Sequence, residues 1–257
     1  MADPSAAELS GLTAVVTGSS SGIGRAIALE LAAAGAACLV HARQSLNEAQ
    51  EVSAEIQSRG AASTVVMADL SESAAHERLV QEAWQWRGAV DIWVNNAGAD
   101  TLTGEAVHWK FERKLEELLR IDVVAAMRLA RLVGKRMKER GAGSIVHIGW
   151  DQAETGQGGD SGELFAAAKG AVMAFSKSLA RSLAPTVRVN CVAPGWIKTA
   201  WGAGASQYWQ DRARRESLLD RWGTPEDVAR AVRFVVSPAA SFITGQTIAV
   251  NGGLKLS

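Results

Sequence analysis

Residues 17–24 read TGSSSGIG, and this stretch decides the fold of the chain. It follows a short apolar run at residues 13–17 and precedes a helical pattern, so it joins a predicted strand to a predicted helix. Gly18 permits a tight turn, while Gly22 and Gly24 let the backbone approach a pyrophosphate. The free N–H groups at the start of the helix favour the same anionic group. The order of strand, loop and helix therefore predicts a dinucleotide site.

Short apolar runs alternate with helical patterns along the rest of the chain. Predicted strands are 13–17, 37–41, 63–68, 91–95, 144–148, 186–192 and 247–250. Predicted helices are 22–34, 46–59, 71–86, 112–139, 164–183 and 225–236, the third with Ser71 as its N-cap. This alternation predicts a single α/β domain over residues 1–257, with a parallel sheet and helices on both faces. We expect residues 1–10 to be flexible.

The bulk composition excludes several classes of partner. The chain has 257 residues, of which 47% are hydrophobic, with 27 basic and 27 acidic side chains and a formal net charge of zero. No basic field favours nucleic acid or a membrane surface. No apolar run is long enough for a membrane span, and residues 1–10 lack the pattern of a signal peptide. Cys38 and Cys191 lie in predicted strands, so we expect free core thiols, a cytoplasmic protein and no metal site.

The segment after the second predicted strand bears on the choice of cofactor. An acidic residue there binds the ribose 2′-hydroxyl of NAD(H), and a basic residue accommodates the 2′-phosphate of NADP(H). Residues 41–45 read HARQS, which contains no acid. The guanidinium of Arg43 can fork onto a phosphate, although an ordinary surface arginine is the alternative. NADP(H) is the predicted cofactor, and NAD(H) is less favoured.

Further motifs occur in the order found in the short-chain dehydrogenase/reductase family. TGSSSGIG resembles the T-G-x-x-x-G-x-G loop of that family, residues 95–98 its N-N-A-G motif, and residues 194–195 its P-G pair. Residues 221–227 (RWGTPED) and 243–253 resemble its C-terminal pattern, so the resemblance extends from about residue 12 to residue 253. It implies a doubly wound (Rossmann) sheet of seven parallel strands. It also implies a homotetramer, or a homodimer, formed by the long helices near 112–139 and 164–183 and the C-terminal strand.

The same resemblance implies the set of cofactor-binding residues. By that resemblance Asp69 contacts the adenine, Lys169 the ribose and Thr199 the carboxamide. The full set is Gly18, Ser20, Ser21, Gly22, Ile23, Gly24, Arg43, Asp69, Leu70, Asn95, Ala97, Gly98, Lys169, Pro194, Gly195, Ile197 and Thr199.

The reaction centre departs from the family pattern of Ser, Tyr and Lys with Y-x-x-x-K spacing. Residues 165–169 read FAAAK, so Phe165 stands in the tyrosine place and Lys169 in the lysine place. Trp150 occupies the serine place, and Asp122 that of a supporting asparagine. Phenylalanine cannot give a proton to a carbonyl oxygen, and losing a general acid typically forfeits ~10²–10⁴ in rate. Because of this departure, the chain resembles the 3-oxoacyl-ACP-reductase-like members of the family only in part.

Asp151 is the first candidate for a replacement acid, and a capping role in its loop is the alternative. Pteridine reductases of the same family carry an aspartate in the serine place, and HARQS resembles their H-x-R-S, but they keep the tyrosine. Asp122 and Glu163 are weaker candidates, and Asp122 is expected chiefly either as a helix hydrogen-bonding residue or as a partner for Lys169. His147 is expected to be a buried, hydrogen-bonded histidine.

Tryptophan is unusually frequent, with nine copies against five phenylalanines and one tyrosine. Trp150, Trp196, Trp201 and Trp209 fall in segments that line the substrate pocket of the family, and Phe165 is expected in the same pocket. Residues 200–219, which include Trp209 and the single tyrosine, are expected to form a lid. Either these indoles fill the core, or they stack on a flat apolar or aromatic substrate.

Two functional hypotheses follow, and a third is weaker. The first is an NADP(H)-dependent oxidoreductase with an atypical centre, acting on a small apolar or aromatic carbonyl, enone or imine. The alternative is a catalytically silent relative that binds a nucleotide and has a regulatory or assembly role. The third is a non-redox catalyst that uses the same pocket.

Overall fold

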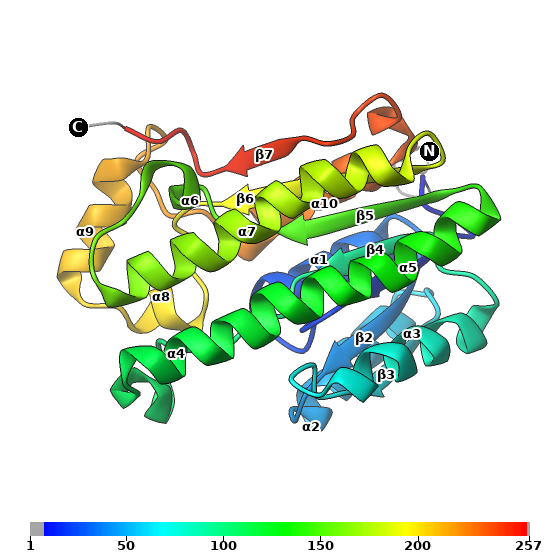
Figure 1. The fold of residues 1–257 in the computed structure, drawn as a ribbon, viewed down its shortest axis with the longest axis horizontal. Coiled ribbons are helices and arrows are strands. Elements are labelled where there is room, and N and C mark those ends of the chain that lie inside the picture. The colour runs from blue at the N-terminus through cyan, green and yellow to red at the C-terminus, as the bar shows by residue number, and fades with distance from the viewer. Residues whose placement is uncertain (1–7, 256–257) are drawn as a thin grey trace.

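The structure is a computed structural model, which describes residues 8–255. Seven parallel strands form a central sheet, as the sequence predicts (Figure 1). Their order in the sheet is β3-β2-β1-β4-β5-β6-β7. The strands are β1 Thr13–Val16, β2 Ala37–Ala42, β3 Ser63–Met67, β4 Ile92–Asn95, β5 Gly143–Ile148, β6 Val187–Pro194 and β7 Thr247–Val250. The strand order reverses between β1 and β4, and such a reversal opens a crevice at the carboxyl ends of the strands.

Helices cover both faces of this sheet (Figure 1). One face packs against α1 Gly22–Ala33, α2 Leu46–Ser58 and α10 Pro225–Val236. The other packs against α3 Ser73–Arg87, α5 Ala126–Arg140 and α7 Asp160–Leu183. β1, β2 and β4 are buried along their whole length, because helices exclude water from both of their faces.

Shorter elements gather mainly beyond the carboxyl ends of the strands. They are η2 Gly104–His108, α4 Phe111–Leu118, α6 Gln152–Thr155, α8 Ala200–Gly204 and α9 Gln207–Glu216. Figure 1 shows α6, α8 and α9 at the end toward which the arrows of β5, β6 and β7 point. A further short helix, η4 Pro238–Ala240, follows α10. The expected lid at 200–219 therefore consists largely of α8 and α9.

Several predicted boundaries differ from the structure. Helix α3 has Glu72 as its N-cap, so the predicted cap at Ser71 is wrong. The Ser71 N–H instead donates to Asp69 Oδ1 at 2.9 Å, and this local turn delays the start of the helix. The predicted helix 112–139 is interrupted by a π-helical segment, η3 Leu119–Ala125, between α4 and α5. Helix α7 begins earlier than predicted, at Asp160.

The core contains the residues expected there. Cys38 and Cys191 are buried free thiols, and Trp93 is fully buried. Of the N-terminal stretch 1–10, residues 1–7 lie outside the described part, while Leu9 is buried and its N–H donates to Ala34 O. In the described residues, no helix is both long and apolar enough to span a membrane.

Candidate active site

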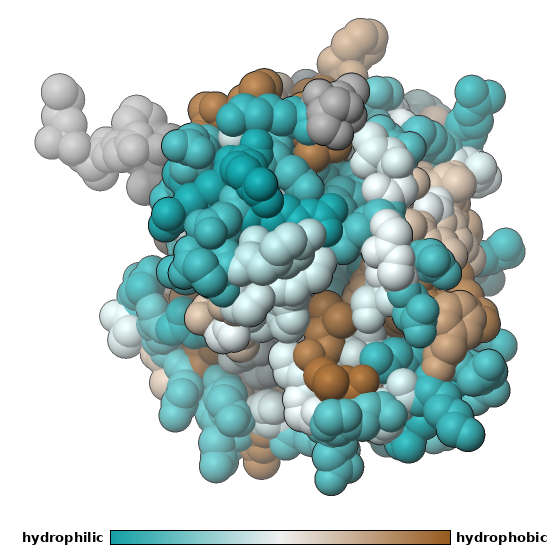
Figure 2. Space-filling model, turned by 90° about the vertical axis from the view of Figure 1, so that its left-hand side faces the viewer, coloured by the Kyte–Doolittle hydropathy of each residue, from teal (hydrophilic) through white to brown (hydrophobic). Residues whose placement is uncertain are grey.

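Two adjoining cavities lie at the carboxyl ends of the strands. The smaller, of about 380 Å³, lies beside the ends of β1, β2 and β4, and the larger, of about 740 Å³, lies between the end of β6 and α7. Four residues line both cavities: Asn96, Gly98, Ala99 and Asp100. The two cavities are therefore parts of one cleft. Figure 2 views the molecule from this end, where apolar surface shows in a gap between polar side chains.

The glycine loop leaves the space that a pyrophosphate needs. Gly22 has φ +54°, and a Cβ placed there would meet no atom within 4 Å. A Cβ at Gly24 would lie 2.2 Å from Gly18 O, so only glycine fits against the turn. The Ser21 side chain does not cap α1, so the N–H groups at the start of that helix remain available to an anion. The loop thus fits a dinucleotide phosphate.

Asn96 holds this loop in place. Its Nδ2 donates to Thr17 O at 2.9 Å and to Gly18 O at 3.0 Å. Thr17 Oγ1 in turn accepts the N–H groups of Asn96 and Ala97, each at 3.0 Å. Sequence reasoning singled out Asn95 instead, but Asn95 is buried at the end of β4 and lines neither cavity. Because side chains alternate in direction along a strand, the burial of Asn95 implies that the next residue, Asn96, points the other way, toward the cavities.

His41 connects the loop to the neighbouring strands. The Gly18 N–H donates to His41 Nδ1 at 3.0 Å, so the proton of the neutral ring resides on Nε2, which lies 3.0 Å from Ala68 O. His41 is only 2% exposed. Burial lowers the pKa of His41 to about 4. The ring is therefore neutral near pH 7, which the hydrogen bond from Gly18 requires.

Arg43 and Asp69 line the smaller cavity, as predicted, together with Leu70. Partial burial raises the pKa of Asp69, but hydrogen bonds from Ser71 and the charges of Arg43 and Arg120 outweigh burial and lower it overall. Within residues 8–255, the guanidinium of Arg43 makes no hydrogen bond or ion pair. This end of the cleft thus presents the Arg43 cation, which has no hydrogen-bonded partner in the described residues, and the ionised Asp69 carboxylate.

Lys169 and Asp122 form the polar centre of the larger cavity. Lys169 Nζ lies 2.9 Å from Asp122 Oδ1, which is the pairing expected from the sequence. Asp122 Oδ2 accepts the Ala99 N–H at 2.8 Å. A Cβ on Gly98 would lie 2.8 Å from Asp122 Oδ1, so glycine is needed for the close approach. Asp122 lies in the π-helical segment η3, a type of interruption that is frequent at functional sites.

Asp151 lies apart from this centre. Its Oδ1 accepts the Gln152 N–H at 2.8 Å and caps α6, and its Oδ2 accepts Asn251 Nδ2 at 3.0 Å. A Cβ on Gly195 would lie 3.1 Å from Asp151 Oδ2, so the carboxylate lies close to Gly195, which lines the cavity. Burial raises the pKa of Asp151, against the effect of these hydrogen bonds. The structure therefore matches the capping interpretation of Asp151, and Asp151 is not among the residues that line the cavity.

Aromatic side chains form the walls of the larger cavity. Trp150 and Phe165 meet edge to face, with ring centroids 6.4 Å apart. Trp196 stacks on Trp201 at 6.2 Å and contacts Trp209 at 5.5 Å. All five rings line the cavity, so the structure brings together Phe165 and the four tryptophans of the predicted pocket segments.

A polar contact orients the Trp196 indole. Trp196 Nε1 donates to Glu216 Oε2 at 2.7 Å, and Arg212 Nε donates to Glu216 Oε1 at 2.6 Å. The Arg212 guanidinium lies over Trp196 and over Trp209, 5.6 and 5.1 Å from their ring centroids. Glu216 and Arg212, both on α9, therefore hold the indoles of Trp196 and Trp209 together.

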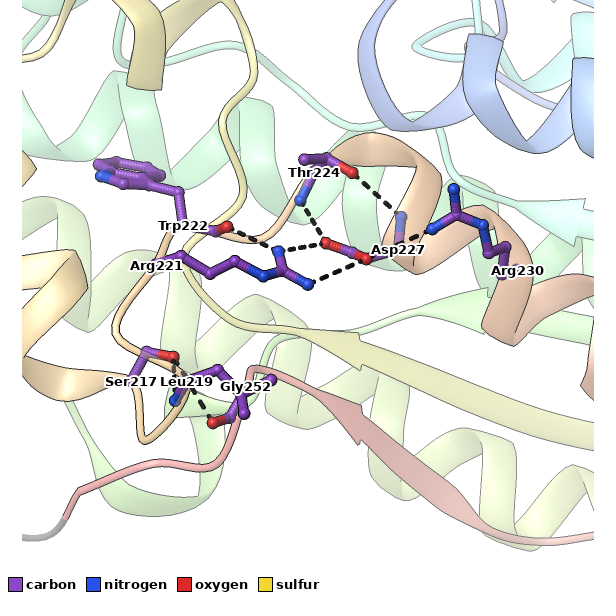
Figure 3. Close-up of polar contacts among 8 residues, drawn as sticks. All are labelled: Ser217, Leu219, Arg221, Trp222, Thr224, Asp227, Arg230 and Gly252. Atoms are coloured by element: carbon purple, nitrogen blue, oxygen red, sulfur yellow. Dashed lines mark hydrogen bonds and ion pairs between the residues drawn. The ribbon is translucent and has the colours of Figure 1, made fainter.

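The C-terminal end of the lid is attached at two places (Figure 3). Arg221 forms a two-pronged ion pair with Asp227, at 2.7 and 3.2 Å, which lowers the pKa of Asp227. Asp227 also accepts the Thr224 N–H in a capping box that begins α10. Earlier in the chain, just after α9, Ser217 Oγ donates to Gly252 O at 3.5 Å. The lid is thus tied both to α10 and to the segment after β7.

Most of the other predicted cofactor residues line one of the two cavities. These are Gly18, Ser20, Ser21, Ile23, Ala97, Gly98, Pro194, Gly195, Ile197 and Thr199. Tyr208 is 60% exposed, and neither it nor the exposed Glu163 is part of the cavity lining. His147 is buried, with Nδ1 2.9 Å from Ser176 Oγ, and burial lowers its pKa to about 3. The described residues contain no cluster of metal ligands.

Comparison with known proteins places this cleft in a family. Residues 18–255 match the family model described as Enoyl-(Acyl carrier protein) reductase. The chain is 36% identical over 251 residues to dehydrogenase/reductase SDR family member 4 of Homo sapiens, covering 95% of this chain and 88% of that protein. It is 36% identical over 247 residues to the 3-oxoacyl-[acyl-carrier-protein] reductase of Escherichia coli strain K12, covering 96% and 98%.

Solved structures agree with the sequence comparison. A short-chain dehydrogenase from Burkholderia cenocepacia in complex with NADP superposes with a TM-score of 0.85 at 32% identity, covering 96% of this chain and 98% of that one. The family model, the curated relatives and the solved structure agree over nearly the whole chain. The chain therefore belongs to the short-chain dehydrogenase/reductase family of oxidoreductases.

Proposed function

We propose that this chain is an NADP(H)-dependent oxidoreductase that acts on a small apolar or aromatic carbonyl, enone or imine. The carrying observation is the continuous cleft, which has Arg43 at one end and Lys169 beside indole walls at the other. The Burkholderia cenocepacia relative is described in complex with NADP, which supports this cofactor.

Arg43 supports NADP(H) over NAD(H). Strand β2 ends at Ala42, and no acid occurs at its end to accept a ribose 2′-hydroxyl. The guanidinium of Arg43 is exposed and lines the smaller cavity. A planar fork of N–H donors is suited to a phosphate, and a charge-assisted contact of this kind is strong.

At the other end of the cleft, the residues of the chain orient the reactants. Lys169, fixed by Asp122, is placed to donate hydrogen bonds to ribose hydroxyls. Thr199 lines the larger cavity and can bond a carboxamide. A nicotinamide, when bound, supplies the hydride. The rings of Trp150 and Phe165 exclude water from the place where the acceptor would lie, which strengthens every electrostatic interaction there.

The proton-donating centre is atypical in this proposal. Phe165 lies on the cavity wall one helical turn before Lys169, and a benzyl group gives no proton. Over residues 8–255, no phenol, imidazole or thiol lines the larger cavity. An acceptor that needs little acid assistance therefore suits the site better than a simple ketone does.

We also propose a cytoplasmic homotetramer or homodimer. The exposed apolar side chains Phe111, Leu119 and Val124 follow one another along α4 and η3, where the family pattern expects a subunit contact. Buried free thiols suit a reducing compartment.

The direct test is oxidation of NADPH with a panel of carbonyl, enone and imine compounds. Wild-type protein is expected to oxidise NADPH with at least one of them, and Lys169→Met to lose most of that activity. No oxidation above background by wild type would sink the proposal. Activity that appeared only in the double variant Phe165→Tyr, Trp150→Ser would identify a catalytically silent relative instead.

A further inference from the structure

The larger cavity combines aromatic faces with an excess of negative charge. Its ionisable lining residues are Asp100, Asp122, Asp160 and Lys169. Asp122 is neutralised by Lys169 at 2.9 Å. Two carboxylates then remain against no free cation in the lining.

These two carboxylates differ in how they are engaged. Asp100 accepts the N–H groups of Leu102 and Thr103, both at 3.0 Å, and the Thr103 hydroxyl, so it stabilises its own turn. Asp160 is the first residue of α7 and is exposed. Its carboxylate makes no hydrogen bond or ion pair with any residue between 8 and 255. Asp160 is therefore the one carboxylate of the described lining that has neither a hydrogen-bond nor an ion-pair partner, and its position in the first turn of α7 suits a negative charge.

Indole faces favour cations over neutral molecules. Trp150, Trp196, Trp201 and Trp209 line the cavity. Two of them, Trp196 and Trp209, already have a cation nearby, because the Arg212 guanidinium lies 5.6 and 5.1 Å from their ring centroids. The negative face of an aromatic ring attracts a cation within about 6 Å, and tryptophan is the strongest of the aromatic side chains in this respect. Several indoles beside one free carboxylate form a site suited to a flat organic cation.

The described lining also contains no tyrosine, histidine or cysteine that could act as a general acid, and this favours the same class of substrate. When a ketone accepts a hydride, its oxygen becomes an alkoxide and must take up a proton. The ammonium of Lys169, the one cationic donor in the described lining, pairs with Asp122, and the proposed function assigns its remaining N–H donors to the ribose hydroxyls. An iminium ion has no such need: its carbon accepts the hydride with its two electrons, and the C=N π pair becomes the nitrogen lone pair. The products are a neutral amine and the oxidised dinucleotide, so charge balances without a proton.

We infer that the substrate is a preformed aromatic or ring-fused iminium cation, held by the indole walls and by Asp160. This inference rests on the proposed function, since a reduced nicotinamide dinucleotide must supply the hydride. It goes beyond that function by fixing the charge of the substrate and by assigning to Asp160 the selection of that charge.

Two bicyclic compounds of matched shape test the inference: N-methyl dihydroisoquinolinium, a permanent cation, and tetralone, a neutral ketone. We expect wild type with NADPH to reduce the cation with a kcat/KM at least about tenfold above that for tetralone. Asp160→Asn should lower kcat/KM for the cation about threefold to fivefold, the effect of losing one exposed charge pair, and leave tetralone unchanged. Glu154→Gln, which removes an exposed carboxylate outside the cavity, is the matched control and should change neither value.

A binding measurement separates charge recognition from chemistry. N,N-dimethyl tetrahydroisoquinolinium has the same fused-ring skeleton and the same charge but no C=N bond to reduce, and its binding is followed by calorimetry. Asp160→Asn should weaken this binding about threefold to fivefold, and Glu154→Gln should not. Equal binding to wild type and Asp160→Asn, or reduction of tetralone in preference to the cation, would overturn the inference while the proposed function stands. Reduction of neither compound, nor of any compound in the wider panel, would overturn both.

Discussion

Lys169 on α7 and Asp122 on η3 form a buried ion pair of 2.9 Å at the floor of the larger cavity. The Asp122 side chain is 1% exposed and that of Lys169 13%. The pair joins two helical segments and fixes the ammonium at the place where the cofactor ribose is proposed to lie. It therefore affects both folding and cofactor binding.

Removing one member of this pair should be costly. Asp122→Ala leaves the Lys169 ammonium without its counter-ion and the Ala99 N–H without its acceptor. We expect a loss of about 3 kcal/mol in the free energy of unfolding, measured by urea denaturation. Lys135→Ala is the control, because it breaks the exposed Lys135–Glu139 pair and should cost less than about 1 kcal/mol. Equal effects of the two substitutions would show that the buried pair has no special role.

The glycine loop should not tolerate a methyl group at Gly24. The new Cβ would lie 2.2 Å from Gly18 O and 2.4 Å from Asn96 Nδ2, so the loop must shift. Overpacking of this kind costs about 1–3 kcal/mol, and we expect NADPH affinity to fall at least about tenfold in a fluorescence titration. Gly170→Ala meets no atom within 4 Å and should leave NADPH affinity unchanged while stabilising α7 by about 0.5–1 kcal/mol. Retained NADPH affinity in Gly24→Ala would contradict the assignment of the loop.

Buried histidines should make stability depend on pH. Burial lowers the pKa of His41 to about 4 and that of His147 to about 3, from an ordinary value of 6.5. Between these values the unfolded chain binds protons that the native state refuses. Stability is thus complete above pH 6.5 and falls as the pH drops toward 4, by about 1.4 kcal/mol per pH unit for each histidine. Asp151, whose pKa is raised by burial, contributes with the opposite sign.

Urea denaturation at a series of pH values measures this slope in wild type and in His41→Asn. The variant should show about half of the histidine contribution, because His147 is then the one remaining member of the two histidines whose pKa burial lowers. The effect of Asp151 is common to both proteins and cancels in the comparison. A slope that did not change would mean that His41 is not held neutral by the fold.

Glu216 should hold the aromatic wall in one arrangement. Glu216→Ala removes the acceptor of Trp196 Nε1 and of Arg212 Nε. We expect weaker near-UV circular dichroism from the stacked indoles and faster proteolysis between residues 200 and 216. Asp211→Ala, on the same helix, removes only a surface contact with Gln207 and is the control. If the control lost as much signal, the contact with Glu216 would not be what orders the lid.

Much of the fold follows from local sequence patterns. Apolar runs such as Cys38–Val40 are continuous because both faces of the sheet are covered, and this feature can be read without a structure. The glycine loop is equally legible, because its glycines are required by backbone geometry at Gly22 and by close contact at Gly24. Such requirements act within a few residues, so a sequence displays them directly.

The side-chain arrangement of the site is less accessible from sequence. Asp151 is next to Trp150, yet its carboxylate accepts a hydrogen bond from Asn251, a residue 100 positions later in the chain. No sequence motif marks Asp160 as a site residue, because its place in the cavity lining depends on the early start of α7. The π-helical segment that carries Asp122 also leaves no sequence signal of its own. These features depend on contacts between distant segments, which periodicity does not encode.

Calorimetric titration of NADPH and NADH into wild type and Arg43→Ala tests the central claim most directly. We expect wild type to bind NADPH more tightly than NADH. Arg43→Ala should lose about tenfold to a hundredfold in NADPH affinity, because a charged hydrogen bond is worth about 1.5–3 kcal/mol, and should bind NADH as before. Equal affinities of wild type for both dinucleotides, or no heat with either, would contradict a cleft built for NADP(H).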